Sequence, residues 1–280
     1  MSYSYLEYAH LPAGRRSRLA ALTQRTAGRL GILEVGAPAP GAEASDPHLA
    51  FQLAAEAAFS GVATSLGIAH TYFPDYAELV PLVLDLNGSF SVAGGAFGGY
   101  ALQATVEDAL RLNAQAVRFT VDLDGNYALT EMDEFRTLRA EAHRYDLPVI
   151  LRAPAASDRR LGVPAVLQGS GLPLDSDLAA AALHLGADMV ELPTVDFEAD
   201  LPDCREEREA AWARTIRDVA MLPVLAHLGA QEDASLALRA ARTAADHGCV
   251  GVVADAALFG RSYQEALALG RRLQKELAAR

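Results

Sequence analysis

The stretch Gly186-Ala187-Asp188-Met189-Val190-Glu191-Leu192-Pro193 joins a small-residue turn to a short apolar run that carries one charged residue. An alanine- and leucine-rich segment of helical character precedes it. A buried parallel strand is typically a short apolar run, and in a (β/α)8 barrel its last residues face the mouth where chemistry takes place. The stretch is therefore typical of a barrel strand that delivers the carboxylate of Glu191 to the mouth.

Other apolar runs of the same kind alternate with helical segments along the chain. These runs lack polar alternation, as expected for strands that are buried on both faces. Eight strand–helix units favour a single closed (β/α)8 TIM barrel over a doubly wound open sheet, which is the alternative. In addition to 186–193, strands are predicted at 28–36, 61–68, 81–87, 116–121, 147–151, 222–226 and 250–254.

Helices are predicted between the strands, and two of them begin with capping residues. Asp46 precedes Pro47 at a first helical position, and Thr105 to Asp108 resembles a capping box. The glycine-rich segment 88–99 is predicted to be a mobile loop over the mouth, and 154–173 a long loop. We expect residues 1–28 to be an N-terminal extension and 29–280 the barrel domain. Helices are predicted at 15–29, 46–59, 75–79, 105–112, 132–145, 175–185, 205–219, 234–247 and 262–279.

The composition is that of a globular protein, with 280 residues, of which 51% are hydrophobic and 21% charged. No apolar run reaches the roughly 18 residues of a membrane span, and segment 1–11 lacks the apolar stretch of a signal peptide. The net charge of −12 argues against nucleic acid and anionic membranes as partners. Cys204 and Cys249 lie far apart without metal-ligand spacing, so we expect free thiols and a cytoplasmic protein. We also expect a homo-oligomer.

Four segments together resemble one known family. Residues 81–88, 104–112, 185–190 and 245–259 are similar to the bacterial and archaeal class I fructose-bisphosphate aldolases, which belong with the deoxyribose-phosphate aldolase-like barrels. The resemblance covers about residues 28–262, and the order of the segments matches throughout. It implies a single barrel of the class I aldolase type.

The catalytic positions of the family differ in this chain. The resemblance implies an aspartate at the end of the first strand, where Glu34 stands, and a tyrosine after the fifth, where Ala153 stands. The position of the Schiff-base lysine is Glu191, and the only lysine in the chain, Lys275, falls in the predicted terminal helix. Because a carboxylate cannot condense with a ketone, we expect no Schiff-base aldolase activity.

The phosphate-binding positions of the family differ as well. Where the resemblance implies a glycine pair after the seventh strand, the chain has His227-Leu228, and where it implies Gly-Arg after the eighth, Asp255-Ala256. Asp85 occupies a third-strand position that often bears lysine or histidine in the family. Negative charge at Asp255 would repel a phosphate dianion, so weak binding of sugar phosphates is expected.

Ionisable residues converge at the predicted carboxyl ends of the strands. Five acids crowded at one mouth require arginine pairing, protonation, a metal or a cationic ligand. We expect Arg152 to pair with Glu191 rather than to anchor an anionic substrate. Asp122 is expected to be an ordinary strand-end residue that pairs with a helix arginine or caps the next helix. The residues concerned are Glu34, Asp85, Asp122, Glu191, Asp255, His70, Arg152 and His227.

Two functional classes remain open. One is a lyase or isomerase that uses acid–base or metal-assisted chemistry on a small polar carbonyl or polyol ligand at the mouth. Glu191 would be its base, His227 its acid, and Asp85 and Arg152 its positioning groups. The other class is a catalytically silent relative that binds a ligand or a partner protein. Residues expected to contact the substrate are Glu34, His70, Asn87 and Asp255.

No cofactor is required by this hypothesis. A hard divalent cation is an alternative, because carboxylate oxygens and an imidazole nitrogen are suitable ligands. Its ligands would be Asp85, Glu191, His227 and Asp255, which share strand ends but no spacing signature.

Overall fold

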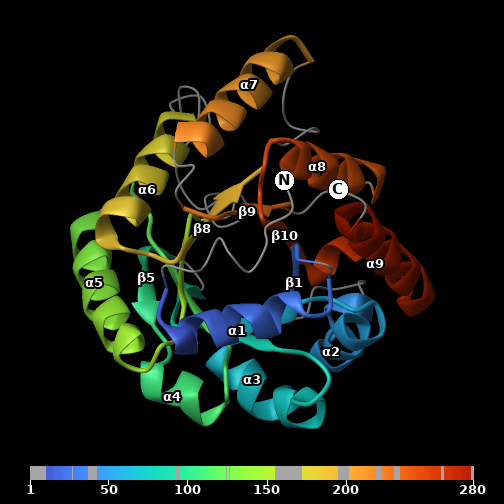
Figure 1. The fold of residues 1–280 in the computed structure, drawn as a ribbon, viewed down its shortest axis with the longest axis horizontal. Coiled ribbons are helices and arrows are strands. Elements are labelled where there is room, and N and C mark those ends of the chain that lie inside the picture. Colours follow the sequence, from blue (N-terminus) through green and yellow to red (C-terminus); the bar gives the residue numbers. More distant parts are fainter. Residues whose placement is uncertain are drawn as a thin grey trace.

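The structure is a computed structural model of the chain (Figure 1). It describes residues 11–26, 28–36, 43–92, 95–123, 125, 127–154, 172–194, 202–218, 222–229, 234–259 and 262–278. The predicted loop 154–173 lies almost wholly outside the described residues, as does most of the segment 1–11.

The parallel strands close into a barrel in the order β1-β10-β9-β8-β7-β6-β3-β2, which confirms the predicted (β/α)8 fold. Each strand is short and buried on both faces, because the helices cover the outside and side chains fill the inside (Figure 1). The strands are β1 Leu30–Val35, β2 Gly61–Ser65, β3 Leu82–Asp85, β6 Ala116–Thr120, β7 Val149–Arg152, β8 Met189–Pro193, β9 Val224–His227 and β10 Gly251–Asp255.

Both predicted helix caps are present. Asp46 accepts hydrogen bonds from the backbone N–H groups of His48 and Leu49 at the start of α2. Thr105 and Asp108 bond each other's backbone N–H in a full capping box at the start of α4. The helices are α1 Ala13–Thr23, α2 Pro47–Glu56, α3 Leu66–Tyr72, α4 Val106–Arg111, α5 Ala128–Arg144, α6 Leu172–Leu185, α7 Pro202–Asp218, α8 Ala234–Asp246 and α9 Tyr263–Ala278, with 3-10 turns at Glu43–Ser45, Phe73–Tyr76 and Ala256–Phe259.

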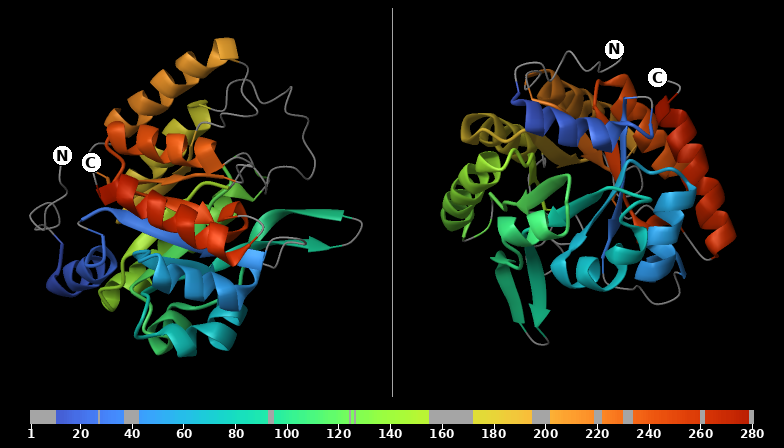
Figure 2. Two further views of the ribbon diagram at one scale, coloured as in Figure 1. Left: turned by 90° about the vertical axis from the view of Figure 1, so that its right-hand side faces the viewer. Right: turned by 60° about the horizontal axis from the view of Figure 1, so that its bottom comes forward.

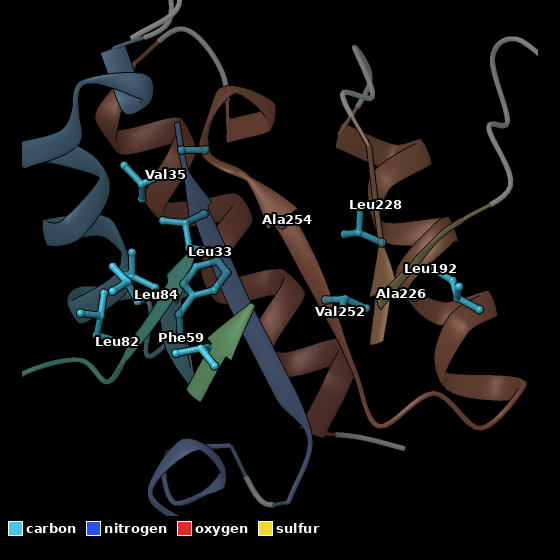
Figure 3. Packing of buried hydrophobic residues seen from close by; sticks show 14 of the residues in the cluster. Leu33, Val35, Phe59, Leu82, Leu84, Leu192, Ala226, Leu228, Val252 and Ala254 are labelled. Atoms are coloured by element: carbon cyan, nitrogen blue, oxygen red, sulfur yellow. The ribbon is translucent and has the colours of Figure 1, made fainter. Parts of the chain in front are cut away.

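A large apolar layer lies between the strands and the helices. Leu33, Val35 and Leu84 point outward from their strands into this layer, as Figure 3 shows. Successive side chains of a strand point to opposite faces, so the residues between them must point into the barrel. Burial of each such side chain stabilises the fold by about 1.5–3 kcal/mol.

Helix α1 crosses the N-terminal end of the barrel (Figures 1 and 2). Its Leu19 and Leu22 are fully buried and belong to the same apolar cluster as the inner residues of the strands. Arg15 anchors the helix through a 2.9 Å hydrogen bond to the carboxylate of Asp188, which His143 also contacts at 2.9 Å. Helix α1 belongs to the predicted N-terminal extension 1–28, and it packs as the floor of the barrel.

Segment 88–99, predicted to be a loop, is instead part of a β-hairpin. Strands β4 (Asn87–Val92) and β5 (Gly95–Leu102) pair antiparallel, and Figure 2 shows them extending away from the barrel. Glycine weakens a strand but does not prevent pairing when the register is fixed at its base. There, the side chain of Asn87 pairs with the backbone of Thr120.

The second strand is shorter than predicted. It ends at Ser65 rather than near 68, and α3 begins directly at Leu66. This carries His70 into an exposed position on α3, away from the strand end.

Among the described residues, no helix is long and apolar enough to cross a membrane. Cys249 is a free, buried thiol, as expected, and burial raises its pKa far above the usual range. The side chain of Cys204 lies outside the described part of the chain.

Candidate active site

The site is a layer of polar residues inside the barrel at the carboxyl ends of the strands. On each strand, the polar residue lies two positions after an apolar residue that points into the barrel. Glu34, for example, lies two positions after Ile32. Because side-chain direction repeats every second residue, both residues of such a pair point inward. We call this set the polar layer; its members are Glu34, Ser65, Asp85, Arg118, Arg152, Glu191, His227 and Asp255.

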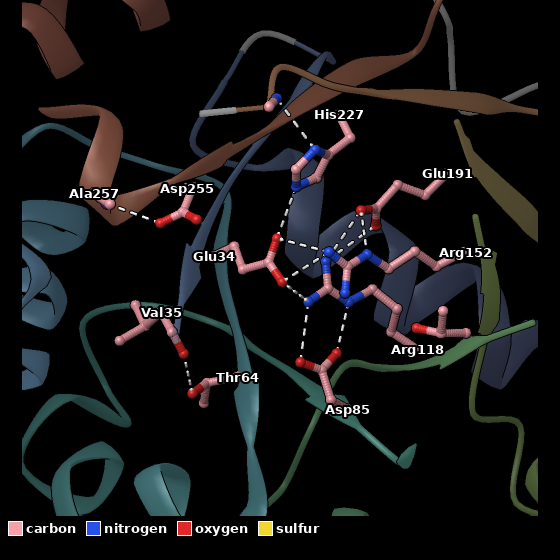
Figure 4. A network of polar contacts seen from close by, with 12 residues as sticks. Glu34, Val35, Thr64, Asp85, Arg118, Arg152, Glu191, His227, Asp255 and Ala257 are labelled. Atoms are coloured by element: carbon pink, nitrogen blue, oxygen red, sulfur yellow. Dashed lines mark hydrogen bonds and ion pairs between the residues drawn. The ribbon is translucent and has the colours of Figure 1, made fainter. Parts of the chain in front are cut away.

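Arg118 of β6 lies at the centre of the polar layer (Figure 4). Its Nε donates to Oδ1 of Asp85 at 2.6 Å, and its Nη2 donates to Oδ2 of Asp85 at 3.0 Å. Nη2 also donates to Glu34 at 2.8 Å, and Nη1 donates to both oxygens of Glu191 at 3.2 Å. One guanidinium, 1% exposed, thus joins acids from three other strands.

Arg152 of β7 is the second cation of the polar layer. Its Nη2 lies 3.2 Å from Glu34 Oε1, and its Nε lies 3.2 Å from Glu191 Oε1. The latter contact confirms the expected pairing of Arg152 with Glu191. It is an ion pair only, because the Nε–H makes no hydrogen bond. Arg152 is therefore held more loosely than Arg118.

His227 of β9 bridges the backbone and Glu34. The N–H of Gly229 donates to Nδ1 of His227 at 3.1 Å, so in the neutral ring the proton resides on Nε2. That Nε2–H points at Oε2 of Glu34, 2.8 Å away. The neutral imidazole is thereby fixed as a hydrogen-bond donor toward the polar layer.

Asp255 of β10 differs from the other acids. Its Oδ1 accepts the backbone N–H of Ala257 at 2.8 Å, and no guanidinium lies within ion-pair distance of it among the described residues. Burial, followed by the negative charge of Glu34, raises the pKa of Asp255. Glu34 and Asp255 are register partners on neighbouring strands, which explains this repulsion.

The remaining pKa values follow from the same crowding. Burial would raise the pKa of Glu34, but Arg118, Arg152 and His227 outweigh it and hold the pKa well below its usual range. For Asp85, burial outweighs the charge of Arg118, and the pKa is raised. Burial lowers the pKa of Arg118, and the three acids more than compensate. With a neutral imidazole, four carboxylates and two guanidiniums leave the polar layer with a formal charge of −2.

The structure brings most of the predicted site residues together. The exceptions are Asn87 and His70, and the latter lies on the outer helix α3. The amide of Asn87 is engaged with the backbone of Thr120: Nδ2 donates to the Thr120 carbonyl at 2.8 Å, and Oδ1 accepts the Thr120 N–H at 2.7 Å. Those that join the polar layer are Glu34, Asp85, Arg152, Glu191, His227 and Asp255.

Arg118 is a site residue that was not predicted from the sequence. A signal was present, since an arginine in the middle of the run Ala116-Val-Arg-Phe-Thr120 is unusual in a buried strand. Glu131 of α5 was also missed. It is buried and accepts the backbone N–H groups of Tyr100 at 3.0 Å and Asp122 at 2.8 Å, which ties the hairpin to the end of β6.

A divalent cation does not fit the polar layer. The potential ligand atoms that lie within 4.8 Å of one another belong to Glu34, Glu191 and His227, a different set from the one expected. Guanidiniums already contact both carboxylates, and the Nε2 of His227 carries a proton where a metal needs a lone pair. The polar layer is therefore not treated as a metal site in the chemistry proposed for it.

The closed parallel barrel with its surrounding helices is a (β/α)8 barrel, and solved aldolase structures share this fold. The chain belongs to the DeoC/LacD family of aldolases, whose family model matches residues 36–260.

Curated relatives match part of the chain. It is 29% identical over 150 residues to the class 1 fructose-bisphosphate aldolase of Thermoproteus tenax, covering 54% of this chain and 53% of the relative. It is 31% identical over 153 residues to the class 1 fructose-bisphosphate aldolase of Halobacterium salinarum, covering 52% and 53%. The matches span about half the length of these relatives.

Solved structures match over nearly the whole chain. Fructose-bisphosphate aldolase from Slackia heliotrinireducens aligns with a TM-score of 0.79 and 20% identity, covering 96% of this chain and 89% of that one. An archaeal fructose 1,6-bisphosphate aldolase aligns with a TM-score of 0.72 and 21% identity, covering 99% of both chains. At these identities the likeness establishes the fold.

Proposed function

We propose that this member of the family is a lyase or isomerase that acts by acid–base catalysis on a small, uncharged polyhydroxy carbonyl compound, without a Schiff base. One observation carries the proposal. Among the described residues, Asp255 is the carboxylate of the polar layer that no guanidinium contacts, and it stands beside the pair formed by Glu34 and His227.

Asp255 is the best-suited base. Its raised pKa lies nearer to neutral pH than that of an ordinary aspartate, and a base works best with a pKa near the working pH. Its Oδ2 makes no hydrogen bond among the described residues, so a substrate proton can reach it. Glu191, the base expected from the sequence, is less suitable because it is 1% exposed and both of its oxygens accept from Arg118.

The opposite side of the polar layer supplies the electrophile. When Asp255 removes a proton from a hydroxyl or from carbon next to a carbonyl, negative charge develops on the carbonyl oxygen. In a cleavage, the bond between the two carbons breaks and its electrons enter the enediolate. A guanidinium would stabilise that oxyanion, because the Nε2–H of His227 already donates to Glu34, and the proton on Asp255 then returns to carbon or oxygen.

Charge limits the substrate class. A formal charge of −2 in a largely buried layer disfavours phosphates and carboxylates and favours hydroxyl groups, which can donate to the acids. An iminium route has no nucleophile, because Lys275 is exposed on α9, outside the barrel. The expected substrates are therefore unphosphorylated.

Deuterium exchange tests the proposal. The protein would be incubated in D2O with glycolaldehyde, dihydroxyacetone, glyceraldehyde or fructose, and proton NMR would follow loss of the C–H signal next to the carbonyl and any cleavage products. We expect exchange with at least one substrate, loss of exchange in Asp255→Asn, and no change in Glu107→Gln, whose carboxylate is exposed on α4. Equal exchange in Asp255→Asn and the parent would refute Asp255 as the base.

A silent, ligand-binding barrel is the second candidate. The closed network around Arg118 favours it, since such a network could also serve only to fill the barrel. If no substrate exchanges while dihydroxyacetone still binds by saturation-transfer NMR, this second function is supported instead.

We also propose a homo-oligomer in the cytoplasm. A deoxyribose phosphate aldolase from Aeropyrum pernix described as tetrameric shares the fold, with a TM-score of 0.51 and 16% identity over 94% of both chains. The free thiol of Cys249 is compatible with a reducing compartment. Light scattering coupled to size exclusion would give the oligomeric state.

A further inference from the structure

Resting on the proposed function, we propose that Arg152, and not Arg118, is the cation that contacts the ligand. Its unpartnered Nε–H would donate to a carbonyl oxygen of the substrate. The two arginines lie in the same layer and contact the same acids, Glu34 and Glu191, yet their hydrogen bonds differ. This difference indicates a structural role for Arg118 and a ligand-binding role for Arg152.

Arg118 has no capacity left for a ligand. Its Nε, Nη1 and Nη2 all donate to carboxylates, and its side chain is 1% exposed. The contact with Asp85 is bidentate, which fixes the plane of the guanidinium. Arg118 therefore acts as a positioning residue that holds the acids in place.

Arg152 has donors to spare. The residue is 9% exposed, and its Nε is a buried donor without a hydrogen-bond partner, although Glu191 Oε1 lies 3.2 Å away in an unsuitable direction. Its one hydrogen bond among the described residues runs from Nη2 to Glu34 Oε2 and is long, at 3.4 Å. A buried donor that lacks an acceptor is unfavourable, so an oxygen atom of a ligand would be stabilised there.

The acceptor must be uncharged in the ground state. Glu34, Asp85 and Asp255 surround this end of the layer, and a carboxylate or phosphate would be repelled by them. A carbonyl oxygen avoids that repulsion on binding and gains negative charge only as the enediolate forms. Arg152 would then bind the transition state more strongly than the substrate, which is the requirement for catalysis.

Binding of glycolohydroxamate, an uncharged mimic of a two-carbon enediol, tests the assignment by calorimetry. Arg152→Gln is compared with the parent and with Arg242→Gln, a surface control in which Arg242 pairs with Glu276. Loss of a charge-assisted hydrogen bond predicts binding that is weaker by about tenfold or more in Arg152→Gln and unchanged in Arg242→Gln. Should Arg152→Gln fail to fold, Arg152→Lys keeps the charge but loses the planar donors, and the same weakening is expected.

Two results would overturn the assignment: no binding by the parent protein, or equal affinity in the parent and both Arg152 variants. The outcomes are distinct from those of the exchange assay. Exchange that needs Asp255 but proceeds with the same kcat and KM in Arg152→Lys would leave the proposed function standing and remove Arg152 from it. Binding that depends on Arg152, without any exchange, would support Arg152 as the ligand-binding cation and refute the proposed catalytic function.

Discussion

The guanidinium of Arg118 meets the carboxylate of Asp85 edge to edge, with Nε–Oδ1 at 2.6 Å and Nη2–Oδ2 at 3.0 Å. The two residues are register partners on the neighbouring strands β3 and β6. This geometry uses one edge of the guanidinium and leaves its Nη1 free to contact Glu191 on β8, across the barrel interior. The pair therefore fixes the orientation of the Arg118 guanidinium, which in turn positions the other acids of the polar layer.

Removal of the Arg118 charge should be strongly destabilising. Arg118→Met leaves three acids without their shared cation, and the free energy of unfolding should fall by about 3–5 kcal/mol at pH 7. In the variant, the folded-state pKa values of these acids would rise, so the cost applies above those values and diminishes as pH falls. Urea unfolding at about pH 7 and 5 measures both effects. Arg242→Met, which breaks an exposed pair, should cost about 1 kcal/mol or less; a similar loss in both variants would contradict the prediction.

Arg152→Ala should be milder, at about 1–3 kcal/mol, because its contacts with Glu34 and Glu191 are longer. Glu191→Gln should cost less still, or should stabilise, since it reduces the crowding of acids. Acidification should recover stability in Arg152→Ala, because the acids that lose their cation become protonated as pH falls and no longer repel one another. If denaturant unfolding at about pH 7 and 5 finds Arg152→Ala neutral and Glu191→Gln severely destabilising, crowding is not the dominant effect.

Asp255→Asn should preserve or raise stability at neutral pH. The folded-state pKa of Asp255 is raised, so its ionised form costs stability above that pKa and costs nothing below it. Removal of the charge should gain about 1 kcal/mol or less at pH 7, and the gain should vanish as pH falls through the raised pKa. Asp133→Asn, at an exposed carboxylate, should not change the pH profile. A loss of stability in Asp255→Asn at pH 7 would show that the hydrogen bond to Ala257 outweighs the repulsion.

No Schiff base should form. Borohydride treatment with dihydroxyacetone phosphate or fructose 1,6-bisphosphate should leave the intact mass unchanged, because the one lysine, Lys275, is exposed on the outer face. A stable adduct that maps to a peptide from the barrel interior would disprove this. An adduct at Lys275 that disappears in Lys275→Arg would only report surface labelling.

Sugar phosphates should bind poorly. We expect a Kd above about 1 mM, roughly −4 kcal/mol, because Asp255 and Glu34 lie where a dianion would have to be accommodated. Calorimetric titration with fructose 1,6-bisphosphate measures this. Micromolar affinity would require a cationic site that these residues do not provide.

The fold could be predicted because its signals are local. The cap at Asp46 and the box at Thr105 act within one helical turn, and the strands are short apolar runs. Most of the candidate site followed from the rule that strand ends meet at the mouth, which brought Glu34, Glu191 and Asp255 together. Arg118 was not predicted as a site residue because it lies in the middle of its strand. Its role depends on acidic partners that are 33 to 84 residues away in sequence.

Two other errors concern secondary structure. The glycines of 88–99 indicate a flexible loop. The pairing of β4 with β5, however, is fixed by contacts of Asn87 and Glu131 with residues more than 30 positions away in sequence, which a local pattern does not reveal. His70 was misplaced because Leu66 and Ile68 fit a strand as well as a helix, and the chain turns into α3 directly after Ser65.

Helix α1 has a kinetic consequence. Leu19 and Leu22 close the N-terminal end of the barrel with buried apolar surface, so the described residues leave no passage from floor to mouth. Any ligand must leave by the opening through which it entered. For a reaction that yields two fragments, the fragment nearer the opening must depart first, which predicts ordered release. The fragment nearer the floor should then inhibit competitively against the substrate, and the first to leave should inhibit noncompetitively.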